Sequence, residues 1–450
     1  MKTCTVTGLL LASLAAGLPS GAAQERDYAS LAGEVRTEFL HTWHGYRTYA
    51  WGHDELRPLS RTFRDWYGEP FYMTAMDALD TMILMGLKDD ADSTREFIAS
   101  HLSFDRDVYV KNFEFTIRFL GGLLSTYQLT GDRRLLRLAR DLGDRLLPAF
   151  RSPTGMPYVE VNLRTGAVRG TVSNPAEIGT LLLEFGTLTG LTGEPRYERA
   201  AKRALDTLFS RRSPIGLVGE SIDITTGRWV GRDSHVSGCI DSYYEYLVKG
   251  ARLLGDPDCR RMWQASIAPL DRWIADSTGG NLWYGHADMR TGERGERLFG
   301  SLDAFFPAVL ALAGDVPRGA RLEESCFRMW QRYGIEPEVI DYGSMTARDS
   351  GYALRPEIIE SAYYLYHFTH DRRYLRMGAV FFDSLKAYCR TDAGYAALAS
   401  VVSKKKRDSM ESFFLAETLK YLYLLFAPPG TLDFDSVTFN TEAHPLRRTW

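Results

Sequence analysis

The sequence predicts an all-α protein built as a toroid of seven helical hairpins, with short β-hairpins on one rim. Three observations predict it. A tight turn recurs about every 45 to 62 residues, apolar residues follow helical spacing around these turns, and strand-like stretches separate successive hairpins. A closed (α/α)7 barrel and an open solenoid share this local pattern, so the repeat alone leaves both architectures open.

Each repeat contains an apolar run that ends in a tight turn, and an acidic residue then opens the next helix. Glycine readily adopts the left-handed conformation that ends a helix, and an acidic side chain complements the positive end of the helix that follows. The clearest turns are residues 129–132, 191–194, 253–256, 312–315 and 368–371, with looser versions at 85–87 and 427–430.

The runs on the two sides of a turn differ in composition, which predicts an inner and an outer helix. The run before a turn, such as residues 121–127, is apolar and rich in small residues, whereas the run after it is more charged. After the turn at Gly193, Tyr197, Ala201 and Leu208 recur at amphipathic helical spacing. We therefore expect the first helix of each pair to lie inside and the second outside.

Strand-like stretches lie between the helical pairs and contain a second kind of turn. They are residues 162–166, 223–227 and 288–292. Each is flanked by alternating or aromatic residues, as at 158–161, which is typical of β-hairpins. Because they precede the inner helices, we expect them to decorate the rim where those helices begin.

Composition narrows the class of protein. The 450 residues carry a net charge of −3, which provides no basic excess for nucleic acid or an anionic membrane. Residues 1–23 have the pattern of a signal peptide, so we expect export to the periplasm or the medium. Residues 24–450 contain no linker and no stretch that resembles a membrane helix, and we expect one catalytic domain, as a monomer. The four later cysteines are scattered, and one disulfide of unknown pairing is possible.

Carboxylates recur at the start of every expected inner helix. A closed ring would gather them around the axis, where buried like charges need a cation, a proton or a polar ligand. Any one of them alone is better explained as a helix cap. Two opposed carboxylates are what glycosidic hydrolysis requires, and such oxygen ligands also suit Ca²⁺. The residues concerned are Asp77, Asp80, Glu114, Glu177, Asp241, Asp303, Glu357, Glu360, Glu411 and Glu417.

Seven short motifs in order, from about Trp51 to Leu446, resemble the class I α-mannosidases of glycoside hydrolase family 47. They include residues 77–81, 113–122, 176–177, 241–247, 354–361, 410–422 and 439–445. Residues 54–59 and 244–250 are similar to the ER degradation-enhancing mannosidase-like branch in particular. No phosphate-binding loop, HExxH or GxSxG motif points to nucleotide, zinc-protease or serine-esterase chemistry.

The resemblance implies an (α/α)7 barrel whose core is plugged by a C-terminal β-hairpin, and an inverting exo-α-mannosidase that removes terminal α-1,2-linked mannose. It implies Ca²⁺ held by the backbone oxygen and hydroxyl of Thr441. Glu114 would be the general acid, directly or through a water, and Glu357 the general base. Asp241 would be the third carboxylate of the site.

The resemblance also implies supporting residues. Arg118 and Arg355 would orient the carboxylates, and Phe413 would stack on the sugar. The acids expected to hold water or substrate are Glu177, Glu360, Glu417 and Glu442. The expected partner is a mannose-containing oligosaccharide.

Two departures from the family pattern lie where glycan branches are selected. Cys239 replaces a frequent arginine, and Gly300–Ser301 replace a frequent Asp-His pair. Asp303 has no family role, and we expect it to be structural. Three alternatives remain: a non-catalytic or weakly active mannose-glycan-binding protein, another toroidal carbohydrate enzyme such as an epimerase, and a scaffold solenoid. The three retained carboxylates favour the enzyme.

Overall fold

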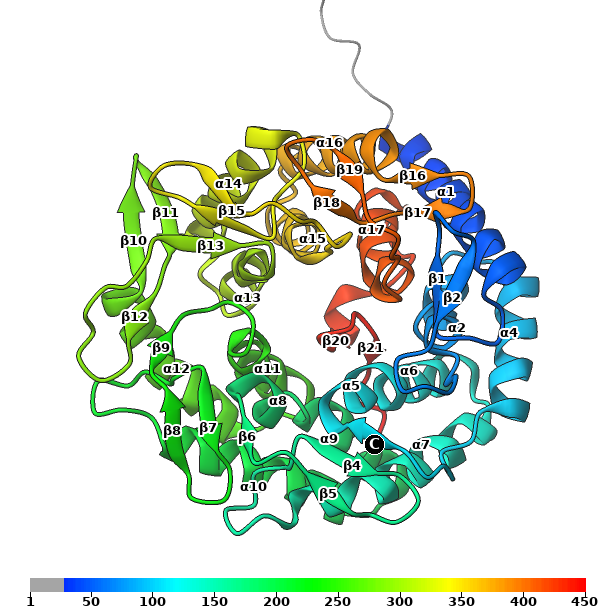
Figure 1. The fold of residues 1–450 in the computed structure, drawn as a ribbon, viewed down its shortest axis with the longest axis horizontal. Helices are drawn as coiled ribbons and strands as arrows, with labels where there is room; N and C mark the ends of the chain where they lie inside the picture. Colours follow the sequence, from blue (N-terminus) through cyan, green and yellow to red (C-terminus); the bar gives the residue numbers. More distant parts are fainter. Residues whose placement is uncertain (1–27) are drawn as a thin grey trace, which may run out of the picture.

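The computed structural model describes residues 28–450, so the expected signal peptide lies outside the described residues. Helices dominate it and form a closed ring of two concentric layers around a central axis (Figure 1). A closed ring excludes the open solenoid that the repeat pattern had allowed. Residues of the inner helices are buried on nearly all sides, as in α11 (Asp241–Leu253), where ten of thirteen residues are buried.

Among residues 28–450 the ring has seven inner and seven outer helical segments, and the inner ones are often interrupted. The inner segments are α2 (Met73–Asp77) with α3 (Leu79–Leu84), α5 (Asn112–Glu114) with η1 (Phe115–Leu120) and α6 (Gly121–Thr130), α8 (Pro175–Gly179) with α9 (Leu182–Thr192), α11, η3 (Leu302–Phe305) with α13 (Phe306–Leu312), α15 (Glu357–Thr369), and η4 (Phe414–Thr418) with α17 (Leu419–Phe426). The outer ones are α1 (Tyr28–Tyr49), α4 (Lys88–His101), α7 (Arg133–Leu146), α10 (Arg196–Ser210), α12 (Pro257–Trp273), α14 (Val316–Tyr333) and α16 (Arg373–Tyr388).

The two ends of the chain close the ring together. The last inner helix, α17, is followed by no outer helix of its own, and α1 from the start of the described chain packs against it instead. The turn at 427–430, which fitted the repeat loosely, therefore ends the series rather than linking a pair. The seventh hairpin is made from helices almost 400 residues apart.

The predicted turn chemistry is present in the linked pairs. Gly131 ends α6 with φ 74°, a left-handed conformation that side-chain-bearing residues rarely adopt. Asp132 then caps α7, because its Oδ1 accepts a hydrogen bond from the backbone N–H of Arg134 at 3.0 Å. Helix α7 buries Leu135, Leu142 and neighbouring apolar residues on one face, as expected for an outer helix.

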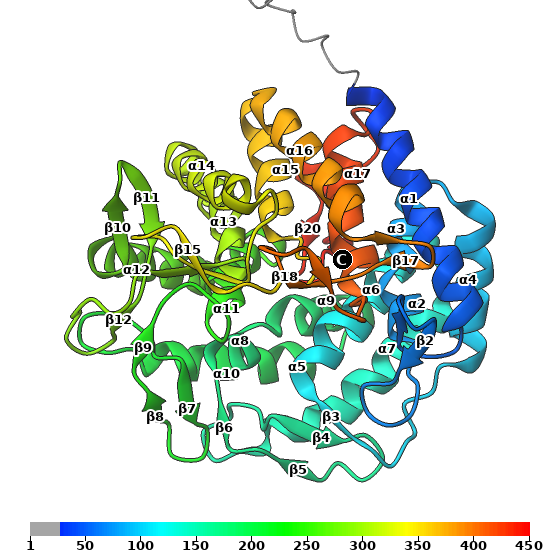
Figure 2. The ribbon, with the colours of Figure 1, turned by 45° about the horizontal axis from the view of Figure 1, so that its top comes forward.

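Short antiparallel strands decorate one rim, at the end where inner helices begin (Figure 2). Two of the three expected hairpins form as predicted, between β4 and β5 and between β7 and β8. The third turn is closed by a single antiparallel bridge between Ala287 and Arg294, and β12 pairs in addition with β9. The strands of the three sheets concerned are β3 (Tyr109–Lys111), β4 (Glu160–Asn162), β5 (Val168–Arg169), β6 (Val172–Ser173), β7 (Ser221–Asp223), β8 (Arg228–Gly231), β9 (Asp233–Ser234) and β12 (Ala287–Asp288).

The remaining short elements connect the repeats. They are β1 (Glu55–Arg57), β2 (Thr62–Arg64), η2 (Leu147–Arg151), β10 (Ala275–Thr278), β11 (Asn281–Tyr284), β13 (Leu298–Gly300), β14 (Val339–Asp341), β15 (Thr346–Asp349), β16 (Arg390–Thr391), β17 (Gly394–Tyr395), β18 (Leu398–Ser400), β19 (Lys405–Lys406) and η5 (Phe434–Ser436). No helix within residues 28–450 is long and apolar enough to cross a membrane. The four cysteines of the described chain are free, so no disulfide forms among them.

A C-terminal β-hairpin of β20 (Thr438–Phe439) and β21 (Pro445–Leu446) lies inside the ring (Figure 1). Its turn is held by Asn440, whose Nδ2 donates to the Ile117 carbonyl and to Glu184 Oε1, both at 2.8 Å. Gly121 permits this approach, because a Cβ there would lie 2.5 Å from Asn440 Nδ2. The hairpin thereby carries residues 441 and 442 into the middle of the barrel.

Candidate active site

A cavity of about 310 Å³ opens among the ends of the inner helices, and its size is within the range of small-molecule sites. Residues from six of the seven inner segments and from the C-terminal hairpin line it. All eleven predicted site residues belong to this lining: Glu114, Arg118, Glu177, Asp241, Arg355, Glu357, Glu360, Phe413, Glu417, Thr441 and Glu442. The fold therefore brings the predicted set together, although it does not by itself assign their roles.

Glu114 and Arg118 are joined across the start of the second inner segment. Arg118 Nε donates to Glu114 Oε2 at 2.9 Å, and Arg118 Nη1 bonds to Glu442 and lies 3.3 Å from Asp77 Oδ2. Arg118 lies within the π-helical turn η1, a distortion often found at functional sites. Burial opposes its charge, but these three carboxylates together raise the pKa of Arg118 well above its usual value. One buried cation thus organises carboxylates from three segments.

Asp241 and Glu357 stand at the first residue of α11 and α15, and both residues are partly buried in the cavity wall. Burial raises the pKa of Asp241 to about 7, and the nearby charges of Glu245 and Asp303 reinforce the shift against hydrogen bonds from Ser242. Burial also raises the pKa of Glu357 to about 8, although the charge of Arg355 opposes it. Carboxyl groups with such pKa values can exchange protons near neutral pH.

Arg355 makes its ion pair with a residue that the sequence did not indicate. Its Nη2 lies 2.9 Å from Glu338 Oε2, and its Nε also donates to that carboxylate. Its charge still lowers the pKa of Glu357. Phe413 lies between the two cavity arginines, with its ring centroid 6.0 Å from the Arg118 guanidinium and 5.5 Å from that of Arg355. Phe413 thereby contributes an aromatic surface to a strongly charged cavity.

Four glutamates line the cavity together with Thr441: Glu357, Glu360, Glu417 and Glu442. Burial raises the pKa of Glu360 to about 7 and of Glu442 to about 8, and burial with mutual repulsion raises that of Glu417 well above its usual value. Glu357 Oε2 is buried and accepts no hydrogen bond from any described residue. A hard divalent cation would relieve this repulsion, and these oxygen donors beside the Thr441 hydroxyl suit Ca²⁺. The residues present therefore fit the expected metal.

Several residues of this network were not singled out by sequence reasoning. Lys249 forms a buried ion pair with Glu245 and lies 3.4 Å from Glu360 Oε1. Glu245 follows Asp241 by four residues and Lys249 follows by four more, so helical spacing could have identified both. No local sequence pattern indicated Glu338 or Trp66. Glu338 bonds to Arg355 from 17 residues earlier in the chain, and the Trp66 ring centroid lies 5.6 Å from the Arg118 guanidinium.

Three further residues discussed in the sequence analysis occupy different places: Asp303 lies outside the cavity lining, whereas Cys239 and Glu177 belong to it. Asp303, expected to be structural, is buried and accepts a hydrogen bond from the backbone N–H of Gly300 at 2.7 Å. Cys239 lines the cavity and has φ 74°, directly before α11. Glu177 also lines the cavity and lies 3.2 Å from Lys111 Nζ. Cys239 thus places a short side chain on the cavity wall, at the position where the family resemblance predicts an arginine.

The motifs and the geometry agree with a known family. The family model described as glycosyl hydrolase family 47 matches residues 38–448. The chain belongs to this family. Among curated relatives, ER degradation-enhancing alpha-mannosidase-like protein 2 of Homo sapiens is 38% identical and aligns over 98% of this chain and 82% of its own length. Alpha-mannosidase I MNS4 of Arabidopsis thaliana is 39% identical over 95% of this chain and 70% of its own.

Solved structures agree with the family 47 fold. The alpha-1,2-mannosidase from Trichoderma reesei superposes with a TM-score of 0.86 at 29% identity, covering 93% of this chain and 99% of that one. Cellobiose 2-epimerase from Bacillus thermoamylovorans has a TM-score of 0.57 at 10% identity, over 88% and 99% of the two chains. At 10% identity, the second similarity shows only a shared fold. The family 47 match therefore favours a mannosidase over the epimerase alternative.

Proposed function

We propose that this family 47 protein is an exported, Ca²⁺-dependent inverting exo-α-mannosidase that removes terminal α-1,2-linked mannose from oligomannose glycans or mannosides. The observation that carries the proposal is the convergence of Glu114, Asp241 and Glu357 on one cavity. The names of the MNS4 and Trichoderma reesei relatives support the activity. A cavity lined by several carboxylates and by the aromatic ring of Phe413 suits a neutral sugar with many hydroxyl groups.

In the proposed reaction, water attacks the anomeric carbon while the glycosidic C–O bond breaks. Glu357 takes a proton from the attacking water, and Glu114 gives a proton to the departing oxygen, directly or through a water. Arg118 holds the Glu114 carboxylate in place through its 2.9 Å hydrogen bond. Asp241 is the third carboxyl group and, with its pKa of about 7, can hold a proton at neutral pH. One displacement with a water nucleophile inverts the anomeric configuration.

Thr441 would hold Ca²⁺ through its backbone oxygen and hydroxyl, with water and sugar hydroxyls as further ligands. Bound Ca²⁺ would supply the positive charge that keeps the surrounding carboxylates ionised, as a general base requires. The remaining positions fit this assignment. Phe413 would pack against the sugar ring, and Glu360, Glu417 and Glu442 would accept hydrogen bonds from substrate or water.

Export rests on the signal-like pattern of residues 1–23. Human endoplasmic reticulum mannosyl-oligosaccharide 1,2-alpha-mannosidase, 36% identical, is named for a compartment of the secretory pathway rather than for the periplasm or the medium. The second candidate function is mannose-glycan binding with weak or no catalysis. The mannosidase-like name of the human relative with 38% identity favours keeping it. The two functions differ in whether a substrate that binds is also cleaved.

Proton NMR of α-1,2-mannobiose hydrolysis tests the proposed function. We expect β-mannose to appear first and α-mannose to follow by mutarotation, because water attacks from the face opposite the leaving group. If α-mannose appears first, the inverting assignment is wrong. If mannobiose binds but is not cleaved, the protein is a glycan-binding protein instead.

Chelation tests the metal separately. After removal of divalent ions we expect hydrolysis to fall by at least about tenfold, because the repelling glutamates around Thr441 lose their counter-ion. Added Ca²⁺ should restore the rate, whereas Mg²⁺, which demands a smaller octahedral site, should not. Thr441→Val is the matched variant, since it keeps the shape but removes the hydroxyl. Full activity in chelator would refute the Ca²⁺ assignment and leave the hydrolase assignment intact.

A further inference from the structure

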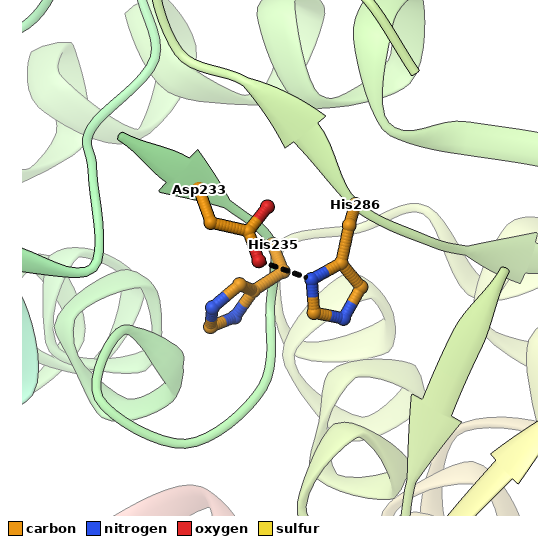
Figure 3. Close-up of side chains that lie close together, drawn as sticks. All are labelled: Asp233, His235 and His286. Atoms are coloured by element: carbon orange, nitrogen blue, oxygen red, sulfur yellow. Dashed lines mark hydrogen bonds and ion pairs between the residues drawn. The ribbon is translucent and has the colours of Figure 1, made fainter. Parts of the chain in front are cut away.

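Three potential metal ligands lie together on the rim, outside the lining of the central cavity. The side chains of Asp233, His235 and His286 approach one another, and each offers a ligand atom within 4.8 Å of the others (Figure 3). Within the described residues, none of the three belongs to the lining of the candidate active site. They therefore form a separate cluster.

The backbone fixes this arrangement. Strands β9 and β12 pair antiparallel, with Ser234 opposite Ala287, and His235 and His286 are the residues that directly adjoin this pair at the end of the ladder. Asp233 and His235 are two residues apart, and side chains at that spacing point to the same face of a strand. Directly opposed residues have Cβ atoms only about 5 Å apart. The convergence of the three side chains thus follows from register.

The existing contacts leave the cluster suited to a cation. Asp233 Oδ2 lies 2.6 Å from His286 Nδ1, and His235 Nδ1 accepts a hydrogen bond from the backbone N–H of Ser237 at 3.1 Å. Since a backbone N–H can only donate, His235 Nδ1 carries the lone pair of this ring, and a metal ion would take it in place of the Ser237 hydrogen bond. Neutral imidazole is the form that binds metals.

Two imidazoles and one carboxylate are a ligand set typical of transition metals, whereas Ca²⁺ prefers oxygen ligands alone. Tetrahedral coordination places ligand atoms about 3.3 Å apart, so binding requires the side chains to close slightly and the His235 ring to turn toward the other two. The partial exposure of Asp233, 40% at its side chain, leaves an open side for a water ligand.

We propose that Asp233, His235 and His286 form a binding site for a divalent transition-metal ion such as Zn²⁺, with water completing the coordination. The ion would join β9 to β12. It would also fix the segment that follows His235, in which Gly238 and Cys239 form part of the cavity wall. This site is distinct from the Ca²⁺ position at Thr441, and the proposal does not depend on the mannosidase activity.

Isothermal titration of chelator-treated full-length protein with Zn²⁺, in saturating Ca²⁺, tests the proposal. We expect one Zn²⁺ per chain, and a rise in Tm of about 3 °C at a hundredfold excess over Kd. Co²⁺ bound at the same site should give the visible absorption of a four-coordinate nitrogen–oxygen site. Absence of stoichiometric binding to the wild-type chain would overturn the proposal.

Variants locate the site. His286→Gln and His235→Asn should each weaken Zn²⁺ binding by about tenfold or more, since each removes one ligand. His53→Gln is the matched control, because His53 Nδ1 makes a comparable 2.9 Å contact with Asp65 Oδ2 but belongs to no three-ligand cluster. Unchanged Zn²⁺ affinity in His286→Gln, whose side chain is only partly buried, would assign the binding elsewhere and refute the proposed ligands.

Discussion

Replacing Glu357 by glutamine is expected to lower kcat for α-mannoside hydrolysis by about 10²–10⁴-fold, while binding of mannosides persists. Glutamine has nearly the same shape but cannot take a proton from water. Glu357 begins α15 and lines the cavity, and its Oε2 is buried without a hydrogen-bond donor among the described residues. The substitution therefore removes proton acceptance without breaking a hydrogen bond to that atom.

Steady-state kinetics and direct binding of a mannoside provide the measurement. Glu323→Gln is the control, because Glu323 on α14 is a buried carboxyl whose two oxygens also have no hydrogen-bond partner, but it lies outside the cavity lining. We expect that control to retain wild-type kcat. A Glu357→Gln protein that keeps a near wild-type kcat would show that another group accepts the proton.

Much of the architecture could be predicted because it depends on local chemistry. The turn at Gly131 and Asp132 uses a left-handed glycine and a side-chain cap, and both act within four residues. The same local turn repeats at regular intervals, so one rule located most helical pairs. The site could be predicted for a related reason. All inner helices begin at the same rim of the barrel, so residues at the starts of different inner helices lie at the same end of the barrel.

The parts that the sequence did not predict depend on partners distant in the chain. Closure of the ring by α1 and α17 requires contact between the two ends. Glu338 pairs with Arg355, and β12 pairs with the distant strand β9 in addition to the single Ala287–Arg294 bridge that closes its own turn. Each choice is decided by packing and strand register in the assembled barrel, which no short sequence pattern records.

The second large effect concerns the buried cluster that holds the C-terminal hairpin. His444 Nδ1 lies 2.7 Å from Asp80 Oδ2, and Lys420 Nζ lies 2.7 Å from Asp80 Oδ1, with all three side chains fully buried. Lys420 also donates to the Ala443 carbonyl at 2.7 Å. His444→Leu is expected to lower the free energy of unfolding by about 3–5 kcal/mol, because it leaves buried carboxylates with one cation fewer.

That loss should lower Tm by about 3–6 °C and should also lower activity, because Thr441 and Glu442 belong to the same hairpin. Thermal unfolding and kinetics of the variant provide the measurement. His367→Leu is the control, since His367 lies 3.6 Å from Asp435 at a partly exposed site and its loss should change stability little. Equal Tm values for wild type and His444→Leu would contradict a stabilising role for the cluster.

The pH dependence of this effect has a definite sign. Burial opposes the charge of His444, but Asp80 raises the pKa of His444 to about 9, above its unfolded value of about 6.5. This stabilisation is full below pH 6.5 and is lost as pH rises through 9. Burial favours the neutral form of Asp80, yet Lys420 and His444 lower its pKa to about 2, so its contribution persists above pH 4. The stability difference between wild type and His444→Leu should therefore be largest between about pH 4 and 6.5 and should shrink toward pH 9. A difference that grows with pH over that range would mean that His444 is neutral in the folded protein.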